Sequence, residues 1–138
     1  MSIYRIKIIN LMLMVFCFSC ASPNLSLKGQ YVNQIEDEGT RIFITRNTGL
    51  KSSAGAFTIS MDGINYFRLW DRETDVLEEP RLGKRKICNY IEGIITVESC
   101  IDVDVKKGDK LFFETRWKSA LSSEIIFVQQ TKEEFLSN

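Results

Sequence analysis

The stretch 84–105 constrains the fold most, because it reads as two β-strands with one cysteine in each. Its second run alternates apolar and polar side chains at every residue, which is typical of a strand with one buried face. Cys100 falls on the polar face of this run, and Cys88 falls among the charged positions of the first run. The stretch therefore predicts an antiparallel strand pair that carries both cysteines on its polar face.

The register of this pair follows from the cysteines. If Cys88 lies opposite Cys100, then Ile91 lies opposite Val97 and a loop at 92–96 joins the strands. Opposed strand residues have Cα atoms roughly 4.5–5.5 Å apart, which is close enough for a disulfide. A tight two-residue Glu-Gly turn is the alternative, and it would put the two cysteines on opposite faces. We favour the longer loop, because it also explains the cysteines.

The start of the chain has the features of an export signal. A basic beginning leads into a short apolar run at 8–18 and then into Ser19-Cys20. The run is shorter than the about 20 apolar residues of a membrane span, and the pattern is typical of a secretory signal. It resembles a bacterial lipoprotein signal, in which a small residue precedes the cysteine that becomes the lipidated first residue. Plain secretion or an uncleaved anchor are the alternatives.

The resemblance implies a domain organisation and a location. Residues 1–19 would be a signal peptide, 20–28 a tether lipidated with palmitate-type chains at Cys20, and 29–138 a single β domain. Ala21 and Ser22 resemble outer-membrane sorting in Gram-negative lipoproteins, so the expected place is the bacterial cell envelope, at the outer membrane. Export also places Cys88 and Cys100 in an oxidising compartment, where disulfides persist.

The charge balance limits the partners. Removal of 19 residues from 138 leaves 119, and loss of Arg5 and Lys7 leaves 16 basic against 18 acidic side chains, a net charge of −2. This is not the basic surface of a nucleic-acid-binding protein. Membrane attachment would have to come from the acyl chains.

Period-two patterns and turn residues predict an all-β fold. About eight short strands are expected, at 30–35, 41–46, 57–61, 64–70, 84–91, 97–105, 110–117 and 124–130. The charged stretch 71–83 is expected to be a long connection. Sequential hairpins favour a small antiparallel meander, closed as a barrel in preference to a sandwich. Thr131 and Glu134 are spaced as a capping box, so a short helical turn should end the chain.

Asp62-Gly63 predicts a tight hairpin between the third and fourth of these strands. In that register Ile59 faces Tyr66 and Phe57 faces Arg68, so apolar side chains appear on both faces of the hairpin. The strand count is loosely similar to lipocalin-like barrels, in which a glycine and an aromatic residue open the first strand. Gly29 and Tyr31 stand at that place.

The composition argues against most enzyme mechanisms. The chain has no histidine, which removes Ser-His-Asp and Cys-His catalysis, and no zinc set or calcium loop is expected. No cofactor is expected either. Paired carboxylates, as in glycoside hydrolysis, are the remaining enzymatic alternative, with Asp102 and Glu114, or Glu98 and Asp104, as candidate pairs.

We therefore expect a non-catalytic binding module, most simply for a protein partner in the envelope or the host. A barrel that binds a small apolar ligand is the alternative. Seven aromatic residues are candidates for a ligand cavity or a partner surface: Phe57, Tyr66, Phe67, Trp70, Phe112, Phe113 and Trp117.

Overall fold

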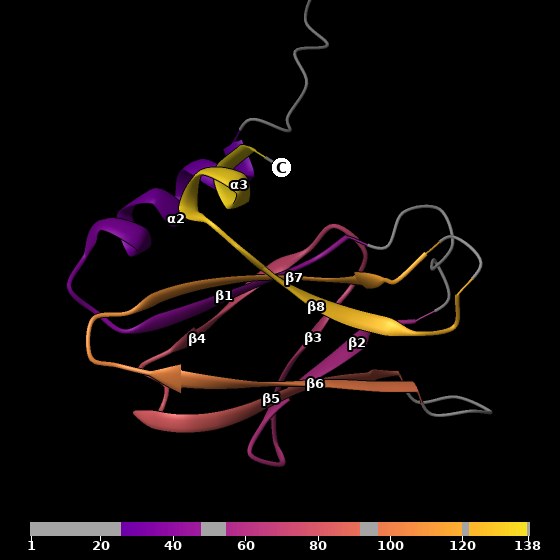
Figure 1. Ribbon diagram of the computed structural model, residues 1–138. Coiled ribbons are helices and arrows are strands. Elements are labelled where there is room, and N and C mark those ends of the chain that lie inside the picture. The colour runs from indigo at the N-terminus through magenta and orange to yellow at the C-terminus, as the bar shows by residue number, and fades with distance from the viewer. Residues whose placement is uncertain (1–25, 48–54, 92–96, 120–121, 138) are drawn as a thin grey trace, which may run out of the picture. The chain divides into compact units, whose positions relative to one another are not determined.

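The computed structural model describes residues 26–47, 55–91, 97–119 and 122–137, which are mostly β-strand (Figure 1). The chain divides into two compact units, 1–33 and 34–138, and both sheets belong to the second unit. Within the described ranges, none of the helices is both long and apolar enough to cross a membrane.

In the part of the chain that the structure describes, eight strands form two four-stranded sheets, with one short helix before them and one after them in the sequence. Sheet A has the order β4-β1-β7-β8, with β1 (Arg41–Arg46), β4 (Thr74–Glu78), β7 (Lys110–Trp117) and β8 (Ile125–Gln130). Sheet B has the order β3-β2-β5-β6, with β2 (Phe57–Met61), β3 (Ile64–Leu69), β5 (Gly83–Ile91) and β6 (Val97–Val105). The helices are α2 (Ser26–Glu36) and α3 (Lys132–Ser137).

Sheet A overturns the prediction of a simple antiparallel meander. Its central strands, β1 and β7, run parallel, with Ile44 opposite Phe113. Both strands carry apolar side chains on both faces, and most of their residues are buried. Strands of this kind belong in the middle of a sheet that is covered on both sides, and this requirement brings together two segments that are far apart in the sequence.

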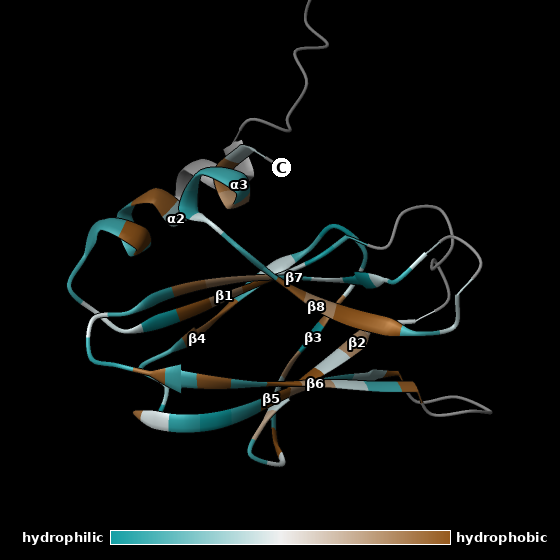
Figure 2. Ribbon diagram, viewed as in Figure 1, coloured by the Kyte–Doolittle hydropathy of each residue, from teal (hydrophilic) through white to brown (hydrophobic). Residues whose placement is uncertain are grey.

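The main core lies between the two sheets. Its fully buried side chains come from both sheets: Ile42, Ile44, Ile59, Met61, Leu69, Leu77, Ile87, Val105 and Phe113. Figure 2 shows the alternation of hydrophobic and hydrophilic residues along β6, which puts one side of that strand on this core. Each fully buried large apolar side chain contributes about 1.5–3 kcal/mol relative to an exposed one, so this core is the main source of the fold's stability.

A second, smaller core covers the opposite face of sheet A. Phe43 and Phe112 stack with their ring centroids 5.1 Å apart, and Phe135 of α3 lies 5.5 and 5.0 Å from them. The predicted capping box holds α3 in place, since Thr131 N donates to Glu134 Oε2 (2.7 Å) and Glu134 N donates to Thr131 Oγ1 (3.1 Å).

The predicted register of β5 and β6 is confirmed. Cys88 lies opposite Cys100 and Ile91 lies opposite Val97. The two cysteines form a disulfide with Cα atoms 4.0 Å apart. The joining loop at 92–96 lies outside the described residues.

The β2–β3 hairpin is confirmed, but its predicted register is wrong beyond the turn. A β-bulge between Ile59 and Ser60 leaves Tyr66 as the extra residue of β3, so that Ile59 lies opposite Phe67 and Phe57 opposite Leu69. Because of the bulge, Phe67 and Leu69 of β3 lie opposite the buried residues of β2. Without the bulge, Tyr66 and Arg68 would take these positions. The hairpin is therefore apolar mainly on one face.

Two predicted segments have other structures. Residues 30–35 lie inside α2, so Gly29 and Tyr31 do not open a strand; Val32 and Ile35 have the three-residue spacing of one helix face. The predicted connection 71–83 contains β4, an edge strand of which only Leu77 is buried in the core.

Asp37 ties together the starts of β1 and β7. Its Oδ1 accepts hydrogen bonds from Arg41 Nη1, from Lys110 Nζ (2.9 Å) and from Gly39 N (2.9 Å). Arg41 Nη1 also donates to the carbonyl of Gln34 near the end of α2 (2.9 Å). The hydrogen bond from Arg41, followed by that from Lys110, holds the pKa of Asp37 well below its usual range.

Candidate functional site

The seven candidate aromatic residues do not form one site. Phe57 and Phe113 are fully buried between the sheets, and Phe112 is buried on the opposite face of sheet A. Phe67 and Trp117 are half-buried, and Phe67 packs against the main core. Of the seven, only Trp70 (53% exposed) and Tyr66 (46%) present about half of their surface to solvent.

The buried rings pack against other rings. Phe57 meets Trp117 edge to face with centroids 6.0 Å apart, and Phe113 meets Phe127 in the same way at 6.2 Å. Such pairs are the usual packing of aromatic side chains in a protein interior. Phe57, Phe113 and Trp117 therefore act as core residues in this arrangement.

Arg46 is a buried residue that the sequence reasoning missed. It is 0% exposed, and its guanidinium donates through Nη1 to the carbonyls of Gly55 and Leu69 (2.9 Å for Leu69). Its Cζ also lies 4.0 Å from the centre of the Phe57 ring. Burial lowers the pKa of Arg46, and the negative charges of Asp71 and Glu73 oppose that shift. Arg46 thus joins β1 of sheet A to the ends of two strands of sheet B.

Asn89 and Thr115 form a second polar link between the sheets. Both are fully buried, and the Asn89 amide donates to Thr115 Oγ1. The alternation of β5 indicates that Asn89 points inward, but nothing in the sequence indicates Thr115 of β7 as its partner.

Three large exposed apolar side chains of the described residues belong to β3, an edge strand of sheet B, or to the residue directly after it. We call Ile64, Tyr66 and Trp70 the β3 edge surface. All three are about half exposed, at 52%, 46% and 53%. The bulge accounts for the exposure of Tyr66, because it leaves this residue without a partner on β2 and places Phe67 opposite the buried Ile59. Leu82, 49% exposed, lies near the turn at the beginning of the strand, where Arg85 donates to its carbonyl and to Asp62.

Hydrogen bonds hold the turn end of the β3 edge surface. Asp62 has a φ of 51° in the turn. Its N–H donates to the Lys86 carbonyl (2.9 Å), and its Oδ1 accepts from Lys86 N (3.0 Å). The turn is therefore attached to β5.

The Trp70 end is held in the same way. Trp70 N donates to Glu73 Oε2 (2.8 Å), and Glu73 N donates to the Trp70 carbonyl (3.1 Å). Arg72 N donates to the carbonyl of the buried Arg46 (2.8 Å). The apolar side chains are thus presented by a strand that is fixed at both ends.

The structure does not bring together either candidate carboxylate pair. Glu98 and Asp104 lie six residues apart on β6, roughly 20 Å at the rise of a strand, whereas glycosidase carboxyls lie about 5–10 Å apart. Glu114 is buried on the outer side of sheet A, where its Oε2 accepts from Gln130 (3.0 Å). Asp102 is on the outer side of sheet B, opposite Lys86.

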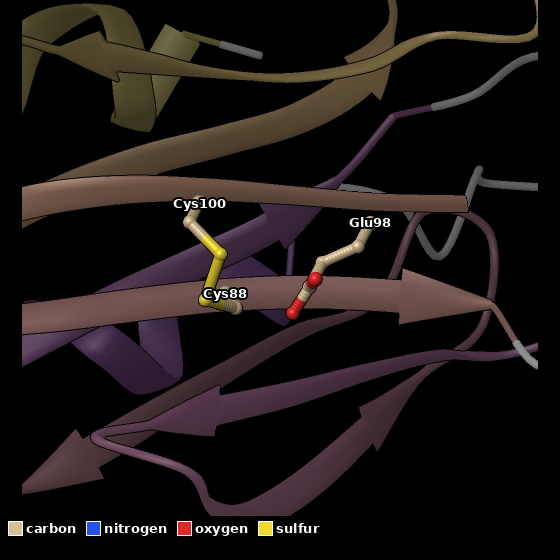
Figure 3. A group of neighbouring side chains, drawn as sticks. All are labelled: Cys88, Glu98 and Cys100. Atoms are coloured by element: carbon tan, nitrogen blue, oxygen red, sulfur yellow. A yellow bond between two sulfur atoms is a disulfide. The ribbon is translucent and has the colours of Figure 1, made fainter. Parts of the chain in front are cut away.

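The outer side of β5 and β6 carries the one cluster of potential metal ligands found among the described residues. The Sγ atoms of Cys88 and Cys100 and a carboxylate oxygen of Glu98 all lie within 4.8 Å of one another. Figure 3 shows Glu98 and Cys100 projecting from β6 toward β5, beside the disulfide. Cys100 and Glu98 are exposed.

Cys20 and the signal segment lie outside the described residues. Comparison with known proteins found no matching family model, no matching curated protein and no matching solved structure.

Proposed function

We propose that the chain is a lipid-anchored protein of the bacterial cell envelope whose β domain binds a protein partner through the β3 edge surface. The observation that carries this proposal is the set of three half-exposed apolar side chains on one edge strand and directly after it, Ile64 and Tyr66 of β3 and the following Trp70. Exposed aromatic and aliphatic groups of this kind often mark protein contacts, and Trp and Tyr are enriched among the residues that dominate binding energy.

The position on an edge strand adds a second reason. β3 pairs only with β2 among the strands of sheet B, so its other edge can accept a strand from a partner. Proteins commonly protect such edges with charge, and β3 carries a single charged side chain, Arg68. A partner that brings an extended segment would cover the apolar side chains and pair with the backbone together.

A barrel that binds a small apolar ligand is the second candidate function. Its candidate lining residues Phe57 and Phe113 are fully buried and pack against the rings of Trp117 and Phe127. This packing favours two closely packed sheets and argues against a hollow barrel. We therefore favour the sandwich-like arrangement and the protein partner. The lipid on Cys20 would keep the domain at the membrane, at the outer membrane in a Gram-negative cell.

Site-specific photo-crosslinking in the native cell envelope tests the partner surface. A photoreactive phenylalanine analogue at Tyr66 should give a covalent adduct, and the same analogue at Tyr90 is the matched control. Tyr90 also replaces an aromatic strand residue, but it lies on β5 opposite Glu98. Adding Trp70→Ser should reduce the Tyr66 adduct at least tenfold, since a central aromatic contact is commonly worth about 2 kcal/mol or more.

Two outcomes would contradict the proposal. One is equal adducts from positions 66 and 90, and the other is a Tyr66 adduct that Trp70→Ser does not change. An adduct of twice the chain's mass would identify the partner as a second copy of this chain.

A further inference from the structure

Two cysteines and a glutamate, a common set of metal ligands, lie together on the outer face of sheet B. In the oxidised chain the two cysteines are joined as a disulfide. Cys88 comes from β5, and Cys100 and Glu98 come from β6, all on the outer face of sheet B. Their ligand atoms lie within 4.8 Å of one another. The alternation of β6 explains why Glu98 lies beside Cys100, because residues 98 and 100 are on the same face of the strand.

We propose that reduction of the Cys88–Cys100 disulfide converts this cluster into a Zn²⁺ site with two thiolates and one carboxylate. Zn²⁺ is bound in proteins by this type of sulfur and oxygen ligand in tetrahedral geometry, and a water molecule would complete the set. The inference is independent of the proposed partner surface.

The scaffold supplies the geometry that such a site needs. The inward neighbours of Cys88, Ile87 and Asn89, are fully buried, and Asn89 is bonded to Thr115 of the other sheet. These contacts do not involve the sulfur atoms. Strand β5 is therefore fixed from its inner side, and the two cysteines stay opposite each other when the bond between them is broken.

The chemical change is a reduction followed by proton release. A dithiol reductant gives an electron pair to the disulfide, the S–S bond breaks, and the reductant becomes a disulfide while two Cys–SH groups form. Binding of one Zn²⁺ to both sulfurs then releases two protons to water. Zn²⁺ affinity should accordingly fall as the pH falls.

The accessible position of the cluster favours this exchange. Cys100 is exposed, so a thiolate of the reductant can approach its sulfur from solvent. In the oxidised chain neither sulfur is a thiolate, and Glu98 alone is a weak ligand. Metal binding at this cluster therefore requires reduction of the disulfide.

Zn²⁺ titration of the full chain tests the proposal, with Cys17→Ser and Cys20→Ser so that the pair at 88 and 100 supplies the only thiols. The chain is prepared oxidised and after reduction with a phosphine, and Zn²⁺ binding is measured by competition with a chromophoric chelator. The reduced chain should bind one Zn²⁺, and Co²⁺ should give a thiolate-to-metal absorption band. The oxidised chain should bind at least 100-fold more weakly.

Glu98→Gln and Asp102→Asn are the matched pair of variants. Both remove a carboxylate that flanks Cys100 on the outer face of β6, but only Glu98 belongs to the cluster. Glu98→Gln should weaken Zn²⁺ binding about tenfold or more, since even the hydrogen-bond partners of metal ligands are commonly worth about 10–100-fold in affinity, and Asp102→Asn should change it less than threefold.

Three results would overturn the proposal. The first is equal Zn²⁺ affinity in the oxidised and reduced chains, and the second is equal affinity in the two carboxylate variants. The third is loss of the β-sheet circular dichroism signal on reduction, because the site depends on the intact strand pair.

Discussion

Arg46 places a guanidinium between the two sheets. It donates to the carbonyls of Gly55 and Leu69 and lies over the Phe57 ring. A buried donor of this kind satisfies backbone acceptors at strand ends, where the sheet ladder no longer provides a partner. Nothing in the sequence RIFITR marks its last arginine as buried, since charged side chains at strand ends usually reach solvent.

Replacement of Arg46 by methionine should lower the free energy of unfolding by about 2–4 kcal/mol. The change removes the side-chain donor from a buried carbonyl and from a partly buried one, and it removes the cation over Phe57. Urea unfolding under oxidising conditions measures the effect. The control is Arg72→Met, because the Arg72 side chain is 78% exposed, and it should change stability by less than about 0.5 kcal/mol. Equal effects of the two variants would contradict the role assigned to Arg46.

At the scale of elements, local patterns predicted the strands whose partners are neighbours in sequence. The register of β5 and β6 followed from alternation and from the two cysteines. The β2–β3 hairpin followed from Asp62-Gly63, but the bulge did not, because turn residues specify the turn and not the ladder beyond it. The β3 edge surface depends on that bulge, so its composition could be predicted only in part.

The pairing of β1 with β7 could not be predicted from local pattern. The two strands are joined by more than sixty residues of chain, and only burial on both faces distinguishes them as central strands. For the same reason, β4 was missed: a charged edge strand with one buried leucine resembles a loop.

The hydrogen-bond network of Asp37 links the end of α2 with β1 and β7, and it should make stability depend on acid. A carboxyl whose pKa is lowered in the folded state stabilises the fold above its unfolded pKa of about 3.9, and this contribution is lost as the pH falls below that value. Asp37→Asn should therefore reduce the free energy of unfolding near neutral pH, and the difference from the unmodified chain should shrink below about pH 4.

Urea unfolding at a series of pH values measures this dependence. Asp75→Asn is the control, because Asp75 is an exposed carboxylate of β4 that accepts a hydrogen bond from the adjacent Val76 N–H. If the Asp37→Asn difference were the same at all pH values, the ionised carboxylate would not be what the network stabilises.

For the molecule as a whole, the packed interior and the exposed β3 edge surface both favour a domain that binds a protein partner over a barrel that holds a small ligand. Sheets A and B bury most of their large apolar side chains between them, and the side chains of the β3 edge surface stay half exposed, where the proposed partner would contact them. The resemblance of the first 20 residues to a lipoprotein signal is the basis for proposing that this domain belongs to the cell envelope. An envelope location would also supply an oxidising environment, in which the Cys88–Cys100 disulfide would be retained.

Mass spectrometry of the chain purified from the bacterial envelope, under native and denaturing conditions, is the most direct test of a lipid-anchored, disulfide-bonded domain without a small ligand. A lipid-anchored chain should have the mass of residues 20–138 with acyl groups on Cys20, lower by two hydrogens for the Cys88–Cys100 disulfide, and should retain no small molecule. A chain that keeps residues 1–19 without acyl groups would contradict the envelope anchor. Two free thiols would contradict the oxidised strand pair, and a retained apolar molecule would favour a ligand-binding barrel over the protein-binding module.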